Sequence, residues 1–172
     1  GDLGSVSGLG WSPDSSRLCA VVTELDGAYV GAQSYQGIVA LLGPGKDPAF
    51  LTHETAAPDS LSPPTFRAIE LEWSDEDQIR FLATFQGRSA LYEVAVTDGA
   101  VKTIASADGT LSGISHSVTG GVAAVLGTQN SPSQIALLDG NSWTAITDNN
   151  KDFFARHPPA TMEKFTLDRA GM

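Results

Sequence analysis

The clearest alternation of apolar and polar positions lies between residues 68 and 106. Four short runs rich in β-branched and aromatic residues occur there, at 68–73, 78–85, 89–96 and 100–105. The breaks between the runs carry turn chemistry: Ser74 to Asp77 can bond their own backbone, and Asp98-Gly99 is a strong hairpin signal. The pattern predicts a four-stranded antiparallel meander. One such sheet cannot stand alone, because it has two faces to cover and two edges to protect.

The same unit recurs before and after this stretch. Each copy carries a short tetrapeptide at its first turn, which we call the corner motif: Trp11-Ser12-Pro13-Asp14, Trp73-Ser74-Asp75-Glu76 and, more loosely, His116-Ser117-Val118-Thr119. Apolar runs follow at 17–23, 37–42 and 49–52 in the first copy, and at 121–127, 134–138 and 142–146 in the third. Trp73 and His116 are 43 positions apart, which is near the roughly 40–45 residues of one propeller blade. We therefore predict an all-β partial β-propeller of about three four-stranded antiparallel blades, at residues 5–52, 68–106 and 110–148.

Several segments do not fit the repeat. Residues 26–36 carry Tyr29 and Tyr35, and they form either a loop on a binding face or the tip of a long hairpin. Residues 53–67 hold three prolines and predict an irregular loop. In the third copy, 130–133 predicts a turn. Residues 151–172 read as a linker that leaves the sheets, docked by Phe153 and Phe154, with a possible strand at 162–167.

The tryptophans stand at informative places. Trp11 and Trp73 occupy equivalent positions, each as the first residue of a corner motif. They line a binding surface or pack between neighbouring blades, and tryptophans repeated at one register favour the packing role. Trp143 lies in the outermost strand of its blade, where we expect partial exposure.

Composition narrows the class of protein. With 41% hydrophobic and 17% charged residues, the chain is typical of a globular domain and not of a disordered one. A net charge of -10 without a basic stripe argues against nucleic-acid binding. No apolar run is long enough to cross a membrane. The single cysteine, Cys19, lies in an apolar strand and is expected to be a buried hydrophobe, so an oxidising compartment is permitted but not indicated. We expect a cytoplasmic protein.

Candidate chemistry is sparse. No G-x-S-x-G elbow occurs, and the nearest match, Gly113-Ile114-Ser115-His116-Ser117, lacks the final glycine. His53, His116 and His157 are scattered singly, which indicates surface or turn histidines and not a triad. Residues 148–152 space oxygens like the start of a calcium loop, but Phe153 replaces the glycine that such a loop needs. Asp75-Glu76-Asp77 is interpreted as a hairpin turn, and Gly8-Leu9-Gly10 lacks the third glycine of a phosphate cradle. We assign no catalytic, cofactor-binding or metal-binding residue, and we expect no cofactor.

The repeats resemble those of a known family. The corner motifs WSPD and WSDE, the strands ALYEVAVTDG and QIALLDG, and the closing runs FLTH and AITD are similar to the propeller repeats of the prolyl oligopeptidase family of serine peptidases. The similarity is greatest to its acylaminoacyl peptidase and dipeptidyl aminopeptidase group. The tail MEKFTLDRAGM resembles the segment with which those proteins enter their α/β-hydrolase domain. The family propeller usually has seven blades, sometimes eight, and the hydrolase domain would follow Met172.

The resemblance implies a noncatalytic propeller fragment of a peptidase that acts on short or N-acylated peptides. The complete propeller would cap the active site and restrict substrate size. The alternative is a TolB-like binding or scaffold propeller without an attached enzyme. The expected partners are the hydrolase domain of the parent protein and, in the full-length protein, a peptide substrate. Open blade faces also predict self-association, including pairwise completion of a six-bladed ring.

Overall fold

A computed structural model describes residues 3–24, 38–52, 67–85 and 88–160, together with Glu163 and Phe165. Tyr29, Tyr35, His53, the proline-rich loop before Arg67 and most of the possible strand at 162–167 lie outside the described residues.

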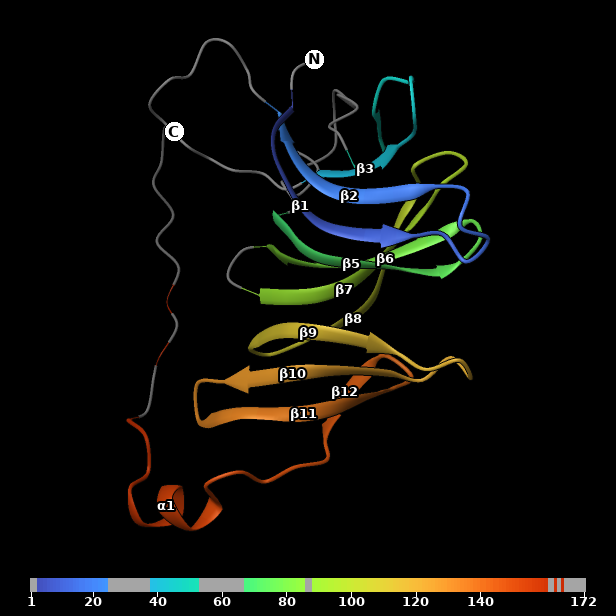
Figure 1. Cartoon of the computed structure of the whole chain (residues 1–172). Coiled ribbons are helices and arrows are strands. Elements are labelled where there is room, and N and C mark those ends of the chain that lie inside the picture. The colour runs from blue at the N-terminus through green and yellow to red at the C-terminus, as the bar shows by residue number, and fades with distance from the viewer. Residues whose placement is uncertain are drawn as a thin grey trace.

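The described chain folds into three four-stranded antiparallel sheets that stack side by side (Figure 1). Within each sheet the strands are neighbours in chain order, so each sheet is a meander. We call the sheets blades 1, 2 and 3. Blade 1 contains β1 (Leu3–Trp11), β2 (Leu18–Glu24), β3 (Ile38–Leu42) and β4 (Ala49–Phe50); blade 2 contains β5 (Arg67–Asp75), β6 (Gln78–Phe85), β7 (Arg88–Ala95) and β8 (Val101–Ser106); blade 3 contains β9 (Thr110–His116), β10 (Val122–Thr128), β11 (Ser131–Asp139) and β12 (Ser142–Ala145). The predicted all-β class with three four-stranded antiparallel blades is confirmed.

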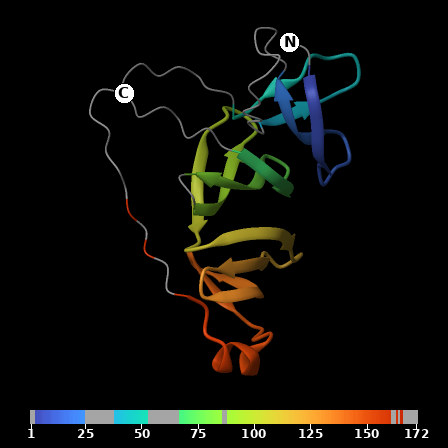
Figure 2. The ribbon, with the colours of Figure 1, turned by 90° about the vertical axis from the view of Figure 1, so that its left-hand side faces the viewer.

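The blades are arranged in sequence order, with blade 2 between the other two (Figures 1 and 2). The first strand of blade 2, β5, contacts β1 on one side and β9 on the other. A view turned by 90° shows the sheets as successive tiers, with blade 1 and blade 3 at the two ends (Figure 2). The outer faces of blades 1 and 3 are therefore the two ends of the stack.

Blade 2 is buried on both faces, and strand β6 shows why. Ile79, Phe81 and Ala83 belong to the apolar cluster shared with blade 1, whereas Leu82 belongs to the cluster shared with blade 3. Alternate side chains of a strand point to opposite faces of the sheet. A strand covered on both sides therefore reads as the near-continuous apolar run QIRFLATF. Phe81 also stacks on Tyr92 of β7, with ring centroids 5.4 Å apart.

One predicted turn is replaced by a strand. The sequence predicts a turn at 130–133, but β11 already begins at Ser131 and the turn is limited to Gln129 and Asn130. Pro132 therefore lies inside a strand. The ladder is irregular here, with a register shift between Leu126 and Thr128 on β10. Proline is tolerated in a strand at such a bulge, because its missing N–H is not needed for the ladder.

The residues after blade 3 contain the only described helix, α1 (Lys151–Arg156), which buries none of its side chains. The prediction that Phe153 docks this segment on the sheets is wrong, because Phe153 is 53% exposed. Its ring instead contacts the rings of Phe154, edge-on at 5.4 Å, and His157, at 4.8 Å. Phe154 is half-buried. The described part of the chain has no helix that is long and apolar enough to cross a membrane.

Candidate functional site

Polar side chains join neighbouring blades at the two seams, so the seams are the candidate site. At the seam between blades 1 and 2, the indole Nε1–H of Trp73 donates to the backbone carbonyl of Gly10 at 3.0 Å. A side chain at position 10 would fit tightly here. A Cβ on Gly10 would lie 3.3 Å from Cys19 Sγ and 3.4 Å from Leu71 Cδ1. The corner tryptophan of blade 2 therefore packs on the preceding blade, as the sequence predicts for it.

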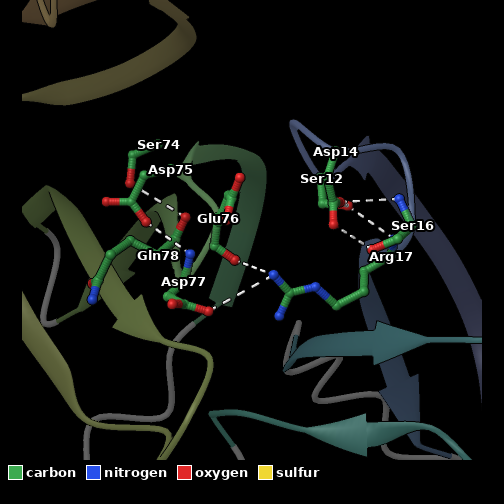
Figure 3. A network of polar contacts seen from close by, with 9 residues as sticks. All are labelled: Ser12, Asp14, Ser16, Arg17, Ser74, Asp75, Glu76, Asp77 and Gln78. Atoms are coloured by element: carbon green, nitrogen blue, oxygen red, sulfur yellow. Dashed lines mark hydrogen bonds and ion pairs between the residues drawn. The ribbon is translucent and has the colours of Figure 1, made fainter.

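Arg17 links the same two blades a second time. Its guanidinium lies 5.0 Å from the centre of the Trp73 ring, where a cation is attracted to the face of the indole. The same group donates to the carbonyl of Glu76 and lies 3.7 Å from the Asp77 carboxylate (Figure 3). Asp77 is well exposed, so this ion pair is weak on its own. Arg17 thus joins the start of β2 to the first turn of the next blade.

The first turn of each of these two blades is closed by an aspartate (Figure 3). Asp14 accepts hydrogen bonds from the hydroxyls of Ser12 at 2.6 Å and Ser16 at 2.7 Å and from the backbone N–H of Ser16 at 3.0 Å. These bonds favour the ionised carboxylate and lower the pKa of Asp14 to about 2. In blade 2, Asp75 accepts the backbone N–H of Asp77 at 2.8 Å. The interpretation of Asp75-Glu76-Asp77 as a hairpin turn is confirmed.

The seam between blades 2 and 3 is charged, and Glu93 is its most buried charge. One of its oxygens accepts from Lys102 Nζ at 2.6 Å, and the other accepts from Arg80 Nε at 3.0 Å and Ser74 Oγ at 3.3 Å. Burial alone would raise the pKa of Glu93, but the hydrogen bonds and positive charges of Lys102 and Arg80 outweigh it, so the pKa is lowered. Glu93 is therefore a fully bonded carboxylate with only 6% of its side chain exposed.

His116 closes this seam from blade 3. Its Nδ1 lies 3.6 Å from Glu72 Oε1, and its Nε2 lies against Arg80 Nη1. Only 15% of the His116 side chain is exposed. The expectation of a surface or turn histidine is wrong here, because the ring ends β9 on the face that packs against blade 2. His157, in contrast, is exposed at the C-terminal end of α1.

Glu72 is the least well bonded member of the group. Burial raises its pKa, and the neighbouring His116 and Arg80 only partly oppose that rise. Its Oε1 is buried and accepts no hydrogen bond. A buried carboxylate oxygen without a donor is costly, so Glu72 is less stable in its ionised form than Glu93.

A third carboxylate fastens the same seam through the backbone. Glu70 accepts the N–H of Gly113 at 3.0 Å and the N–H of Ile114 at 2.9 Å. Gly113 has a φ of 63°, and the pairing of β9 with β10 is irregular at this point. The bulge leaves these two N–H groups for blade 2 to bond.

Two sequence predictions about the seams have opposite outcomes. Cys19 is fully buried, its Sγ–H donates to the Gly10 carbonyl at 3.3 Å, and burial raises its pKa to about 12, so its role as a small buried group is confirmed. The expectation that Trp11 packs between blades like Trp73 is wrong, because Trp11 is 66% exposed. It projects from the face of blade 1 that points away from blade 2.

Trp143 is half-buried as expected, and its Nε1 is buried without a hydrogen-bond partner.

The contacts described so far hold neighbouring blades together. Ser115 is exposed within a strand, not on a strand-to-helix turn. Among the residues that the structure describes, no group of three or more His, Cys, Asp or Glu side chains could hold a metal ion. Asp148, at the start of the calcium-like spacing, pairs with Lys151 at 3.0 Å. The polar side chains of the seams bind one blade to the next.

Meanders stacked in this way, each packed face to face on the one before, are consecutive blades of a β-propeller. No family model and no curated protein matches the chain. Among solved structures it is similar to putative TolB from Agrobacterium tumefaciens, with a TM-score of 0.63, 17% identity and coverage of 86% of this chain and 51% of that chain. It is also similar to the apo AtxE2 isopeptidase, with a TM-score of 0.59, 14% identity and coverage of 83% and 20%.

A third similar structure is a puromycin-hydrolyzing peptidase from Mycobacterium tuberculosis, with a TM-score of 0.58, 14% identity and coverage of 85% and 22%. The chain therefore spans about half the length of the TolB structure and about a fifth of each peptidase structure. At these identities the likeness shows the fold, which occurs both in TolB and in proteins that contain a peptidase.

Proposed function

We propose that this chain is a noncatalytic propeller segment of a serine peptidase of the prolyl oligopeptidase family, of the acylaminoacyl or dipeptidyl aminopeptidase type. The corner and strand motifs support this proposal, and two peptidase structures share the fold. The parent protein would act on short or N-acylated peptides in the cytoplasm. Its hydrolase domain would be the main partner of this segment.

The observation that carries the noncatalytic role is the pairing of the charged side chains at the blade seams. Glu72, Arg80, Glu93 and His116 would be the obvious candidates for acid–base chemistry, yet their contacts are with one another across or along the seam. Side chains that contact one another across the seam, as His116 does with Glu72 and Arg80, keep neighbouring blades in register. A propeller held rigid by such contacts can narrow the path to an active site and select substrates by size.

The proposal is tested by assaying the isolated chain with acyl-peptide and aminoacyl chromogenic substrates. We expect no turnover above a buffer control. Turnover that a serine-directed inhibitor abolishes would refute the noncatalytic role. In the parent protein, replacing Glu93 and Arg80 to loosen the seam should let longer peptides be cleaved while the rate on dipeptide-sized substrates is kept.

A TolB-like binding or scaffold propeller is the second candidate, favoured by the TM-score of 0.63 to putative TolB. The two candidates differ in what the parent gene encodes beside this segment. A G-x-S-x-G elbow followed by an aspartate and a histidine supports the peptidase, whereas further blades without an elbow support the scaffold. Reading the coding sequence on both sides of the segment decides between them.

A further inference from the structure

The ring of His116 lies between two groups of opposite charge on blade 2. Its Nε2 lies against Arg80 Nη1, and its Nδ1 lies 3.6 Å from Glu72 Oε1. Glu72 and Arg80 stand opposite one another on β5 and β6, so the sheet of blade 2 holds both partners in place. Each ring nitrogen of His116 therefore has its own neighbour on blade 2.

The contact with Arg80 determines which ring nitrogen carries the proton. A guanidinium group has only hydrogen-bond donors, so Nε2 of His116 must be the acceptor. A neutral imidazole with one accepting nitrogen carries its proton on the other, which here is Nδ1. The distance of 3.6 Å from Nδ1 to Glu72 is longer than a hydrogen bond, and Glu72 Oε1 accepts none. His116 is thus neutral in this arrangement, and its N–H is directed toward Glu72.

A second proton on the ring would reverse these preferences. Nε2–H would then be a donor that faces the donors of Arg80, and two positive groups would be in contact. Nδ1–H would be a charged donor beside a buried carboxylate oxygen that has no hydrogen bond. The gap of 3.6 Å needs to close only to the roughly 2.8 Å of a charge-assisted hydrogen bond. A protonated ring would therefore leave Arg80 and bond Glu72.

The other charged groups of the packed strands permit this exchange. Arg80 keeps a partner when the ring leaves it, because its Nε donates to Glu93 on β7 at 3.0 Å. Glu70, the other carboxylate that reaches blade 3 from β5, is bonded to two backbone N–H groups of β9 and holds that strand in place. Strand β10, which pairs with β9, carries no titratable residue. The groups that face His116 are thus Glu72 and Arg80, with Glu93 behind Arg80.

We propose that His116 is a proton-operated joint between blades 2 and 3, which accepts a hydrogen bond from Arg80 when neutral and donates one to Glu72 when protonated. Histidine is the side chain that normally changes its charge between about pH 5 and 8. Acidification in this range would move the attachment of His116 from β6 to β5 and would not break the seam. The joint does not depend on whether the parent protein is a peptidase, because its readout is the protonation and coupling of His116 and not turnover.

The test follows the ring nitrogens by NMR in the wild-type chain with isotopically labelled histidine, and the exposed His157 is the internal control. At about pH 8 we expect the proton of His116 on Nδ1 and none on Nε2, whereas His157 should show the mixture of tautomers of a free imidazole. At about pH 5.5 both nitrogens of His116 should be protonated. Its Nδ1–H should then exchange with water about tenfold or more slowly than that of His157, because Glu72 bonds it.

Double-mutant cycles identify the partner of His116 at each pH. His116→Ala is combined with Arg80→Gln or with Glu72→Gln, and urea denaturation measures the unfolding equilibrium constant. At about pH 8 His116 should couple to Arg80 by about fivefold or more and more weakly to Glu72, and at about pH 5.5 the order should reverse. His157→Ala is the matched control and should couple to neither residue at either pH.

Four results would each overturn the proposal. Two are a protonated Nε2 of His116 at about pH 8 and an Nε2 that stays unprotonated at about pH 5.5. The third is an Nδ1–H that exchanges in acid as fast as that of His157. The fourth is a coupling to Arg80 that stays larger than the coupling to Glu72 in acid. The NMR measurements need no substitution at the seam, so they decide the question even where a variant does not fold.

Discussion

Trp73 reaches across from its own blade to bond the carbonyl of Gly10, 63 residues earlier in the chain. Tryptophan and glycine are usually counted as nonpolar residues, yet this hydrogen bond fixes the position of blade 2 on blade 1. The cation–π contact with Arg17 also depends on where this indole lies.

Replacing Trp73 by phenylalanine should therefore destabilise the chain by about 1–2 kcal/mol, because the bond to Gly10 is lost and the smaller ring leaves part of the seam unfilled. The matched control is Trp11→Phe, at the equivalent but exposed corner position, which should change the free energy of unfolding by less than about 0.5 kcal/mol. Urea denaturation of monomeric protein measures both. Equal losses would contradict the difference in packing between the two tryptophans.

Glu93 should be the most sensitive carboxylate at neutral pH. Glu93→Gln removes charge-assisted hydrogen bonds from Lys102 and Arg80, so we expect a loss of about 2–3 kcal/mol in the free energy of unfolding. Asp77→Asn is the control, because its ion pair with Arg17 is exposed and should contribute about 0–1 kcal/mol. A loss with Glu93→Gln no larger than that with Asp77→Asn would show that the bonds of Glu93 to Lys102 and Arg80 contribute no more than an exposed ion pair.

The contribution of Glu93 should also disappear in acid. Its pKa in the folded chain is lowered from the ordinary value of 4.5, so the unfolded chain takes up the proton first as the pH falls. The difference in stability between wild type and Glu93→Gln should therefore be fully present above pH 4.5 and shrink as the pH falls through the lowered value. Denaturation curves at a series of pH values measure this, and a difference that grows in acid would have the wrong sign.

Glu72 should show the opposite trend. Its pKa is raised above 4.5, mainly by burial, so the folded chain holds this proton to a higher pH than the unfolded chain does. Ionised Glu72 then lowers stability progressively as the pH rises from 4.5 through the raised value. Glu72→Gln removes this effect, so the stability of the variant relative to wild type should increase over that range. A constant difference would show that burial does not control this carboxyl.

Cys19 should be unreactive in the folded chain. Its thiol is buried and its pKa is raised to about 12, so almost no thiolate is present near neutral pH. Ellman's reagent at pH 8 should therefore label the native chain much more slowly than the chain unfolded in urea. Rapid labelling without denaturant would show that the Gly10 and Cys19 side of the seam opens readily.

The strands are well predicted from the sequence because strand and turn signals are local. Alternation and turn residues place β6 at its observed bounds and most other strands within a few residues. The exception at Pro132 arises because a bulge in the partner strand, which the local sequence does not reveal, makes room for proline. The local sequence also does not reveal why Trp73 is buried and Trp11 is exposed. The two corner motifs are similar, but Trp73 packs on blade 1, whereas Trp11 has no such neighbour among the described residues.

The seam between blades 2 and 3 is not predicted by any single motif, because its members are far apart in the chain. His116 meets Glu72 from 44 positions away. A signal is nevertheless present in the repeats. When the corner motifs are aligned, Glu72 corresponds to Gly10, because each residue immediately precedes the motif of its blade. Gly10 contacts Trp73, the first residue of the next corner motif. Applied to the third copy, that rule pairs His116 with Glu72.

The meander order of each sheet has a consequence for how the chain opens. Each described strand pairs only with its neighbours in chain order, so each blade can form from its own stretch of sequence before the seams close. Blade 2 has a neighbour on both faces, whereas blades 1 and 3 each have one among the described residues. Amide protons of β6 and β7 should exchange with deuterium last, and loss of structure should proceed inward from the two ends.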